Sequence, residues 1–225
     1  MRYEKEYFEK ASYSQRRQLI MKHVAEVLRW GSKSSHINLL DGHGKTALDV
    51  GCAYGYGVAV LKMLGYDSCG VDISKYSVSQ AKKTNPNVDF AICDAQDGLP
   101  FDEDAFDVVT CFEVLEHLSN PLRAIRNMLG SCRKVMIFTT PNRAVEKPVK
   151  KIVRDFDGTH VSGRTPQEWK RDLSKIVQNS EVQVESFLDS TLRVSNKLLF
   201  FKSFKIPYLG LDTRVMIRKM AEAKR

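Results

Sequence analysis

The sequence predicts a doubly wound α/β domain, in which a mostly parallel sheet carries helices on both faces. Short apolar segments alternate with amphipathic segments of helical length from about residue 45 to residue 188, which is the pattern of successive βαβ units. A glycine-rich turn follows the first apolar segment directly. The chain has 225 residues, 43% of them hydrophobic, and this is enough to fill the core of one such domain.

The first three strands are expected at residues 45–50, 67–71 and 88–93. A helix over 58–64 lies between the first two and is stopped by Gly65 in the C-cap region. Ser74 is the expected N-cap of the next helix, which ends before Asn85 and Pro86.

Four more strands are expected at residues 106–111, 134–139, 182–188 and 213–217. Asn120 and Pro121 have the N-cap and N1 chemistry of a helix that closes at Gly130. Thr165 and Glu168 have the spacing of a capping box with proline at N1. The helix that this box opens is expected to be amphipathic, with Trp169, Leu173, Ile176 and Val177 on its apolar side.

A further amphipathic helix is expected at residues 14–30, before the first strand. The expected organisation is a single domain over residues 1–225. Residues 1–36 form an N-terminal helical cap, residues 37–195 a ligand-binding core, and residues 196–225 a basic C-terminal segment that carries the last strand.

The positive charge of the chain is concentrated in its last third. Residues 1–141 hold 17 basic and 17 acidic residues, whereas residues 142–225 hold 18 and 10. Such an excess attracts anionic partners such as nucleic acid or phospholipid headgroups, but a basic tail that is only solvated explains it equally well.

The cysteines and the hydropathy pattern exclude several classes of protein. Five cysteines, an odd number with no Cys-x-x-Cys pair, do not indicate a closed disulfide framework or zinc, so we expect buried reduced thiols and no metal site. No stretch approaches the ~20 apolar residues that span a bilayer, and the first residues lack a signal-peptide core. We therefore expect a cytoplasmic protein.

The glycine-rich turn indicates a nucleotide ligand, and two enzyme classes compete for it. Gly51, Gly55 and Gly57 let the backbone approach a ligand at the carboxyl edge of the sheet. Their spacing is also that of short-chain dehydrogenases, which need a Tyr-x-x-x-Lys pair. None of the eight tyrosines has lysine four residues on, so a dehydrogenase would lack its catalytic pair.

Aspartates at three successive strand ends favour a ligand without phosphate. Asp49 would repel a pyrophosphate at the following helix N-terminus, but it suits the ammonium and sulfonium groups of S-adenosylmethionine. Asp72 is placed to accept hydrogen bonds from two ribose hydroxyls, and Asp94 to accept one from an adenine amino group.

These motifs together resemble the class I S-adenosylmethionine-dependent methyltransferases. The segments that carry the resemblance are 48–55, Asp72, 93–95, 111–117 (Cys-Phe-Glu-Val-Leu-Glu-His), 139–142 (Thr-Thr-Pro-Asn), 158–160 and 165–169. They are most similar to the small-molecule branch that includes quinone-biosynthesis methyltransferases. The resemblance implies a Rossmann-like sheet of seven strands whose last strand is antiparallel.

The resemblance also implies which residues surround the cofactor. They are Asp49, Gly51, Cys52, Ala53 and Gly55 at the methionine part, Asp72 and Ile73 at the ribose, Asp94 and Ala95 at the adenine, and Phe112 near the centre of the cofactor. Ala53 departs from the family pattern, which has glycine there. An alanine predicts a negative φ at this position unless strain is stored.

Two histidines at the same sheet edge are the candidate catalytic bases. Methyl transfer from a sulfonium needs alignment, and a hydroxyl or carbon acceptor also needs a base. His117 follows the fourth strand and His160 lies before the capping-box helix; a structural or hydrogen-bonding role is the alternative for each. Glu113 and Glu116 are expected on a solvated helix surface.

The sequence defines the methyl acceptor less closely than the cofactor. The stretch 196–210, expected to be helical, mixes leucine and phenylalanine with lysine, so it either packs on the sheet or binds a lipid-like substrate or an anionic surface. The sequence therefore predicts methyl transfer to an O, N or C nucleophile of a small or amphiphilic molecule. The alternatives are a cofactor-binding regulatory protein without turnover, or an RNA or protein methyltransferase; the oligomeric state is not indicated.

Overall fold

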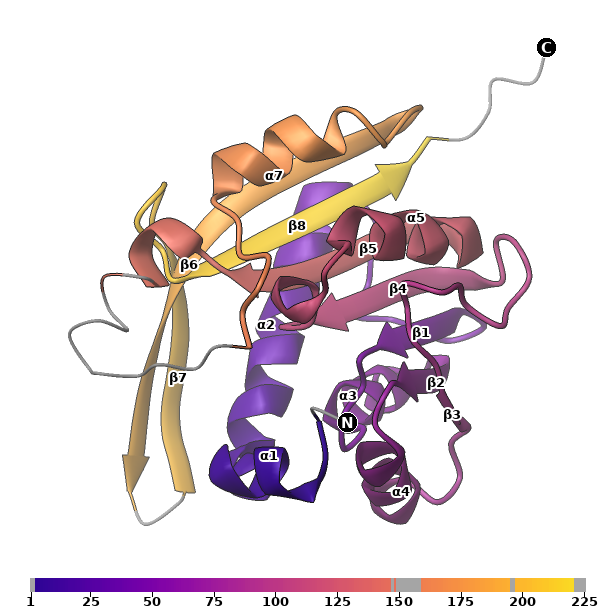
Figure 1. Ribbon diagram of the computed structural model, residues 1–225, viewed down its shortest axis with the longest axis vertical. Coiled ribbons are helices and arrows are strands. Elements are labelled where there is room, and N and C mark those ends of the chain that lie inside the picture. The colour runs from indigo at the N-terminus through magenta and orange to yellow at the C-terminus, as the bar shows by residue number, and fades with distance from the viewer. Residues whose placement is uncertain (1–2, 147, 149–158, 195–196, 221–225) are drawn as a thin grey trace.

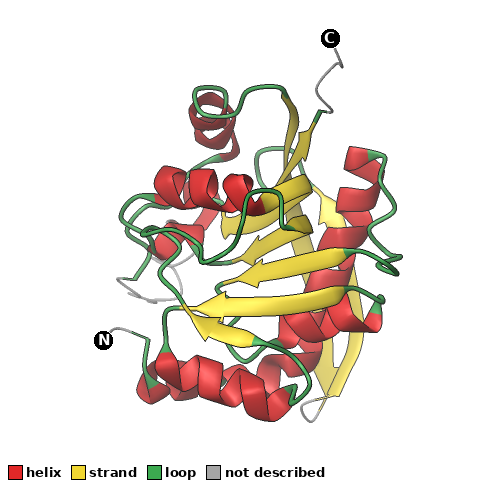
Figure 2. Ribbon diagram, turned by 90° about the vertical axis from the view of Figure 1, so that its right-hand side faces the viewer, coloured by secondary structure: helices red, strands yellow, loops and turns green. Residues whose placement is uncertain are grey.

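The computed structural model describes all residues except 1–2, 147, 149–158, 195–196 and 221–225, and it leaves the side chains of 193–197 undescribed. One twisted sheet runs through the molecule, with helices on both of its faces (Figures 1 and 2). The described strands are β1 (Thr46–Val50), β2 (Asp67–Asp72), β3 (Phe90–Ile92), β4 (Phe106–Phe112), β5 (Cys132–Pro141), β6 (Ser180–Val194), β7 (Lys197–Lys205) and β8 (Asp212–Lys219).

The strand order in the described sheet is β3-β2-β1-β4-β5-β8-β6-β7. The pairs from β3 to β5 are all parallel, whereas β8 is antiparallel to β5 and to β6. The prediction of a doubly wound, mostly parallel sheet with an antiparallel last strand is therefore confirmed.

The described helices are α1 (Lys5–Lys10), η1 (Tyr13–Arg16), α2 (Arg17–Ser35), α3 (Tyr56–Met63), α4 (Lys75–Thr84), η2 (Leu115–His117), α5 (Pro121–Ser131) and α7 (Pro166–Leu173). Helices α2, α3, α5 and α7 each bury apolar side chains against the sheet, whereas Phe8 of α1 packs in an aromatic cluster. Ile125 of α5 and Trp169 of α7 lie in the core on one face, and Leu28 of α2 and Leu61 of α3 lie in the core on the other.

Helix starts agree with the sequence because their causes are local. The side chain of Ser74 accepts a hydrogen bond from the backbone N–H of Ser77, and Asn120 accepts one from that of Arg123. Thr165 and Glu168 form the expected capping box. The helix they open is shorter than expected, since it ends at Leu173.

Most of the described part of the stretch 196–210, which was expected to be helical, is strand β7, and the described sheet has eight strands in place of seven. β7 pairs antiparallel with the second half of β6, from Phe187↔Lys205 to Val194↔Lys197. The first half of β6 pairs with β8 and ends at Phe187↔Asp212. The hairpin of β6 and β7 therefore extends beyond the sheet edge at which β5 ends (Figure 1). Consecutive leucines and phenylalanines favour a strand once a partner strand is present.

Parallel pairing brings the chain segments after β1 to β5 to one edge of the sheet. The glycine turn, Asp72, Asp94, Phe112 and the residues that follow them all lie there. Ligands of open α/β sheets bind outside this carboxyl edge.

Candidate active site

The turn after β1 is tightly enclosed, and glycine is required at two of its positions. Gly51 and Gly55 have φ of 75° and 76°, a region that side chains disfavour. A Cβ atom on Gly51 would also lie 2.3 Å from a methyl carbon of Val114. The turn is therefore fixed against the segment that follows β4.

Ala53, between these glycines, has φ of 46°, so the expected negative value is wrong. Its backbone N–H donates a hydrogen bond of 2.8 Å to Oδ2 of Asp72. This bond holds the left-handed conformation in place, at a conformational cost of about 1–2 kcal/mol for a residue with a Cβ.

Asp49 and Asp72 both lie buried beside the turn, 3% and 8% exposed. Thr110 donates from its hydroxyl to Asp49 Oδ1 over 2.8 Å, but burial dominates and raises the pKa of Asp49 to about 7, with the charge of Asp72 adding to the shift. Burial also raises the pKa of Asp72, against the hydrogen bonds that the backbone N–H groups of Ser74 and Ala53 donate.

The remaining predicted cofactor residues spread along the same edge. Cys52 and Ala95 are buried, and Ile73 is 39% exposed. Asp94 accepts a hydrogen bond from the backbone of Gln96. The ring of Phe112 lies 6.5 Å from that of His23, edge to face.

An N-terminal aromatic cluster covers the turn, and this contact was not predicted from the sequence. The ring of Tyr13 stacks on Tyr56 with centroids 5.6 Å apart and lies 5.0 Å from Tyr54. Burial, followed by the charges of Asp49 and Asp72, raises the pKa of Tyr13. The phenol of Tyr13 is therefore near enough to feel the charges of the carboxylates that the sequence assigned to the cofactor. The aromatic run Tyr3, Tyr7, Phe8 and Tyr13 was the available signal.

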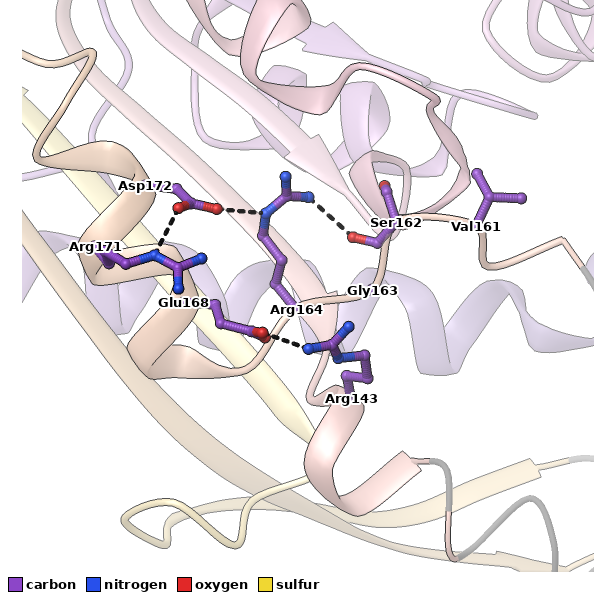
Figure 3. Close-up of a pocket in the computed structure, with 8 residues that line it drawn as sticks. All are labelled: Arg143, Val161, Ser162, Gly163, Arg164, Glu168, Arg171 and Asp172. Atoms are coloured by element: carbon purple, nitrogen blue, oxygen red, sulfur yellow. Dashed lines mark hydrogen bonds and ion pairs between the residues drawn. The ribbon is translucent and has the colours of Figure 1, made fainter.

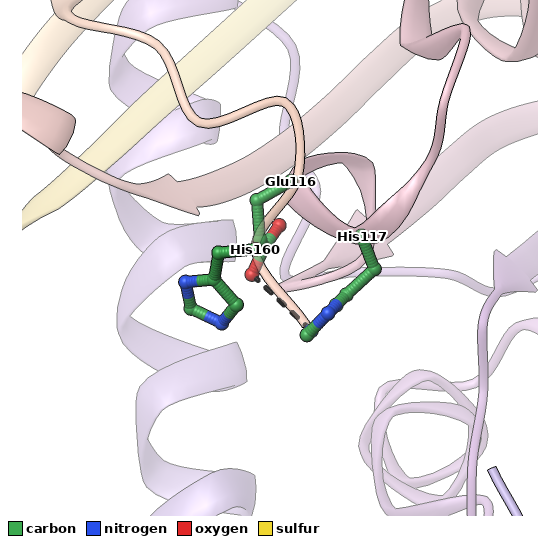
Figure 4. Close-up of side chains that lie close together, drawn as sticks. All are labelled: Glu116, His117 and His160. Carbon is green, nitrogen blue, oxygen red and sulfur yellow. Dashed lines mark ion pairs between the residues drawn. The ribbon is translucent and has the colours of Figure 1, made fainter. Parts of the chain in front are cut away.

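The structure brings both candidate catalytic histidines together. The rings of His117, in η2, and His160, in the loop before α7, have centroids 4.7 Å apart (Figure 4). His117 Nε2 lies 3.8 Å from Glu116 Oε1. Nδ1 of His160 lies 2.5 Å from Glu146 Oε1.

The predicted solvated position of Glu116 is wrong. Glu116 is 1% exposed because the loop before α7 folds over η2: Ser162 donates from its backbone N–H to the carbonyl of Glu116 and from its hydroxyl to that of Leu115. Glu113 is not on a helix surface either: it lies in a turn with φ of 54°, and the hydroxyl of Thr139 donates to its Oε1 over 2.8 Å.

Comparisons with known proteins agree with this arrangement. A family model described as a methyltransferase domain matches residues 48–135. A ubiquinone biosynthesis O-methyltransferase of Aliivibrio fischeri is 32% identical over 149 residues, which are 62% of this chain and 60% of that protein. The chain therefore matches somewhat more than half the length of this curated relative.

Two solved structures share the fold. A SAM-dependent methyltransferase from Archaeoglobus fulgidus matches 95% of this chain and all of its own, with a TM-score of 0.66 and 17% identity. Magnesium protoporphyrin IX methyltransferase from Synechocystis, solved with bound SAH, matches 95% of this chain and 97% of its own, with a TM-score of 0.62 and 16% identity.

These comparisons support a class I S-adenosylmethionine-dependent methyltransferase similar to the quinone-biosynthesis enzymes. The glycine turn with Asp49 and Asp72 lies within the matched domain, and so do Phe112 and His117. His160 lies outside it. None of the described helices of the chain is long and apolar enough to cross a bilayer.

Two groups of side chains in the described part of the chain have the composition of metal ligands. Glu116, His117 and His160 form the first, and His23, Asp189 and Asp212 the second; in each, one ligand atom per residue lies within 4.8 Å of the others. Arg214, however, donates to Asp189 over 3.0 Å and to Asp212 over 2.8 Å. The second group is therefore an ion-pair network whose negative charge a guanidinium already balances.

A cavity of about 230 Å³ beside α7 is lined by charged side chains (Figure 3). Arg164 and Arg171 each lie 3.0 Å from an oxygen of Asp172, and Arg143 pairs with Glu168. These pairs support the loop that carries His160, since Arg164 also donates to the carbonyl of Ser162. We assign the cavity a structural role.

Proposed function

We propose that the protein transfers a methyl group from S-adenosylmethionine, in line, to a nucleophilic oxygen, nitrogen or carbon of a small or amphiphilic molecule. The observation that supports this proposal is that a glycine turn with two buried carboxylates and a pair of imidazoles lie along one sheet edge. We assign the donor side to the glycine turn and its carboxylates, and the acceptor side to His117 and His160.

On the donor side, Asp49 is proposed to face the cationic methionine part of the cofactor and Asp72 the ribose hydroxyls. Both carboxylates are desolvated in this structure, so a cationic ligand gains strongly from them. The proposal keeps Gly51, Cys52, Ala53 and Gly55 at the methionine part, and it keeps Ile73, Asp94, Ala95 and Phe112 along the rest of the cofactor.

On the acceptor side, His117 and His160 are proposed to act where the acceptor loses its proton. The leaving group is a neutral thioether and needs no proton, so alignment supplies most of the rate; effective molarities of about 10⁵ M are known for well-aligned reactants. A hydroxyl acceptor must in addition be deprotonated at this point.

The β6–β7 hairpin supports an amphiphilic acceptor. Leu192 and Phe200 are opposite each other in the register and are 55% and 43% exposed. Phe204 is 41% exposed, and the Lys202 ammonium lies 5.1 Å from its ring centroid. An apolar face with cations beside it is the chemistry that anionic amphiphiles bind. The side chain of Lys197, also part of this expectation, lies outside the described residues.

We also propose that the protein acts in the cytoplasm. All five cysteines are free in the structure, the state that a reducing compartment maintains. This supports the cytoplasm as the place of action.

The test has two stages. Calorimetry of the full chain should show binding of S-adenosylmethionine, and incubation with methyl-labelled cofactor should label a lipid or metabolite fraction. Cofactor binding with no label in any fraction would favour a regulatory protein, and label in RNA or protein would exclude a small acceptor. Binding to anionic and to zwitterionic vesicles tests the role of the hairpin. Phe200→Ser should weaken binding to the anionic vesicles, whereas Leu40→Ser, at another exposed apolar residue, is the control.

A further inference from the structure

We propose that His23, oriented by Asp189, takes the proton of a hydroxyl acceptor when the methyl group is transferred. His23 lies on α2 and Asp189 on β6, 166 residues further along the chain. The pairing of the two side chains stands on their geometry alone. The role of His23 as a base rests on the function proposed above, and it names the group that removes the proton there.

The ring of His23 is oriented by a direct hydrogen bond to a carboxylate. Its Nδ1 lies 2.8 Å from Oδ2 of Asp189. Because a carboxylate only accepts, Nδ1 carries the proton of this bond, and the lone pair of the neutral ring is on Nε2. In catalytic pairs of histidine and aspartate, the carboxylate fixes the ring in this tautomer so that Nε2 is the basic nitrogen.

Asp189 is itself held through its other oxygen. The hydroxyl of Ser203, which is opposite Asp189 on β7, donates to Oδ1 over 2.6 Å, and the guanidinium of Arg214 donates to the same oxygen over 3.0 Å. Burial raises the pKa of Asp189, but the bond from His23 and these two contacts outweigh it and hold the pKa below its ordinary value. An ionised carboxylate at this place stabilises the imidazolium that forms when the ring takes a proton.

Nε2 of His23 is buried and has no hydrogen-bond partner among the described residues. Buried polar atoms are nearly always hydrogen-bonded, and an exception calls for a reason such as a catalytic role. The hydroxyl of a bound acceptor would donate to this nitrogen and satisfy it. The His23 side chain as a whole is 18% exposed, so Nε2 lies near the surface, and catalytic hydrogen bonds often close only when the substrate binds.

His23 lies at the sheet edge to which the cofactor is assigned. Its ring packs edge to face on Phe112, at the end of β4, with centroids 6.5 Å apart. Glu113, the next residue, is near enough to feel the charges of both His23 and His160. The base and the paired imidazoles therefore belong to one neighbourhood, although His23 comes from the N-terminal part of the chain.

The surrounding charges strengthen His23 as a base. Burial lowers its pKa, but the hydrogen bond to Asp189 and the charge of Asp212 outweigh this effect. Arg214 opposes them, and the result is a pKa above the ordinary value of 6.5. A general base is most effective when its pKa lies near the operating pH, and the shift of His23 is in that direction.

In the proposed step, the proton of the acceptor hydroxyl moves to Nε2 of His23. The acceptor oxygen forms the new bond to the methyl carbon, and the electron pair of the broken S–C bond stays on the sulfur of a neutral thioether. The imidazolium, paired with Asp189, then releases its proton to solvent. His117 and His160 keep the place given to them above, where they bind and orient the acceptor.

A matched substitution separates a base from a structural histidine. His23→Asn keeps a side-chain N–H that donates to Asp189, but it removes Nε2. The full-length wild type and variant are incubated with methyl-labelled S-adenosylmethionine and a lipid and metabolite extract. The initial rate of label transfer should fall by about 10²- to 10⁴-fold in His23→Asn, while calorimetry should show an unchanged Kd for the cofactor. His43→Asn, in an exposed pair with Asp41, is the control and should keep the wild-type rate.

Asp189 is a positioning residue, and nitrogen NMR of the histidine rings tests it without turnover. The neutral ring of His23 should carry its proton on Nδ1 in the wild type. In Asp189→Asn the amide group also donates, so the Nε2-protonated form should become populated. This measurement keeps the proposal testable if His23→Asn fails to fold. An unchanged tautomer in Asp189→Asn would overturn the orienting role.

The outcomes distinguish this inference from the proposed function. Label transfer at the same rate by the wild type and His23→Asn would overturn the base and leave the proposed function standing. An equal loss of rate in His43→Asn would also count against a specific role of His23. A wild type that transfers no label would remove the proposed function and the base with it, whereas the tautomer measurement would still decide the pairing with Asp189.

Discussion

The backbone N–H of Ala53 donates a 2.8 Å hydrogen bond to Asp72 Oδ2, and this joins the turn after β1 to the end of β2. The bond explains how an alanine holds a left-handed conformation, with φ of 46°, at a position where the family has glycine. Strained backbone of this kind is concentrated at functional sites.

Replacing Ala53 by glycine should therefore stabilise the protein. Ala53→Gly removes the steric cost of the positive φ, and we expect the free energy of unfolding to rise by ~1 kcal/mol. Urea denaturation measures this. Ala59→Gly within α3 is the control and should lower the free energy of unfolding by about 1 kcal/mol. A lower free energy of unfolding in both variants would contradict the proposed backbone strain at Ala53.

Removing the Asp72 carboxylate should weaken cofactor binding without unfolding the protein. Asp72→Asn loses charge-assisted hydrogen bonds worth about 1.5–3 kcal/mol, so the Kd of S-adenosylmethionine should rise roughly 10- to 100-fold. Calorimetry measures the Kd, with Asp97→Asn as control because Asp97 is 78% exposed. An unchanged Kd in Asp72→Asn would argue against the ribose assignment.

The protonation of Asp49 should make stability depend on pH. Burial raises its pKa from 3.8 to about 7 in the folded state, so the folded protein holds this proton more tightly than the unfolded chain does. The resulting stabilisation is complete below about pH 4, falls as the pH rises, and is lost above about pH 7.

Asp49→Asn should flatten this dependence. The variant should be more stable than the wild type at about pH 8, while Thr110 still donates to the amide oxygen. Urea denaturation at about pH 5 and pH 8 gives the comparison. Parallel pH profiles for the two proteins would mean that Asp49 is ionised in the folded state throughout this range.

The aromatic cluster around Tyr13 should slow the exchange of cofactor. Tyr13→Ala removes contacts with Tyr54 and Tyr56, each worth about 0.5–1.5 kcal/mol, and we expect cofactor dissociation to be about 10-fold faster. Stopped-flow displacement measures the rate. Tyr208→Ala, at an exposed tyrosine, should release the cofactor as fast as the wild type does. If Tyr13→Ala also releases it at the wild-type rate, the aromatic cluster does not control cofactor exchange.

The sequence by itself determined the features that depend on neighbours along the chain. Ser74, Asn120 and Thr165 start helices through bonds to residues three positions away, and the strand–helix alternation specifies the parallel core. The order of aspartates after successive strands predicted that they lie at one edge for the same reason, because parallel strands end there; their role at the cofactor stays a proposal.

The tertiary structure alone decided the features that depend on distant partners. β7 forms because β6 extends beyond β8 and offers it an edge. Tyr13 contacts Tyr54 and Tyr56 only once α1 and η1 lie across the turn. Glu116 is buried because the loop at Ser162 covers it. Pairing energy and desolvation act between segments that only folding brings together, and local sequence patterns do not contain that information.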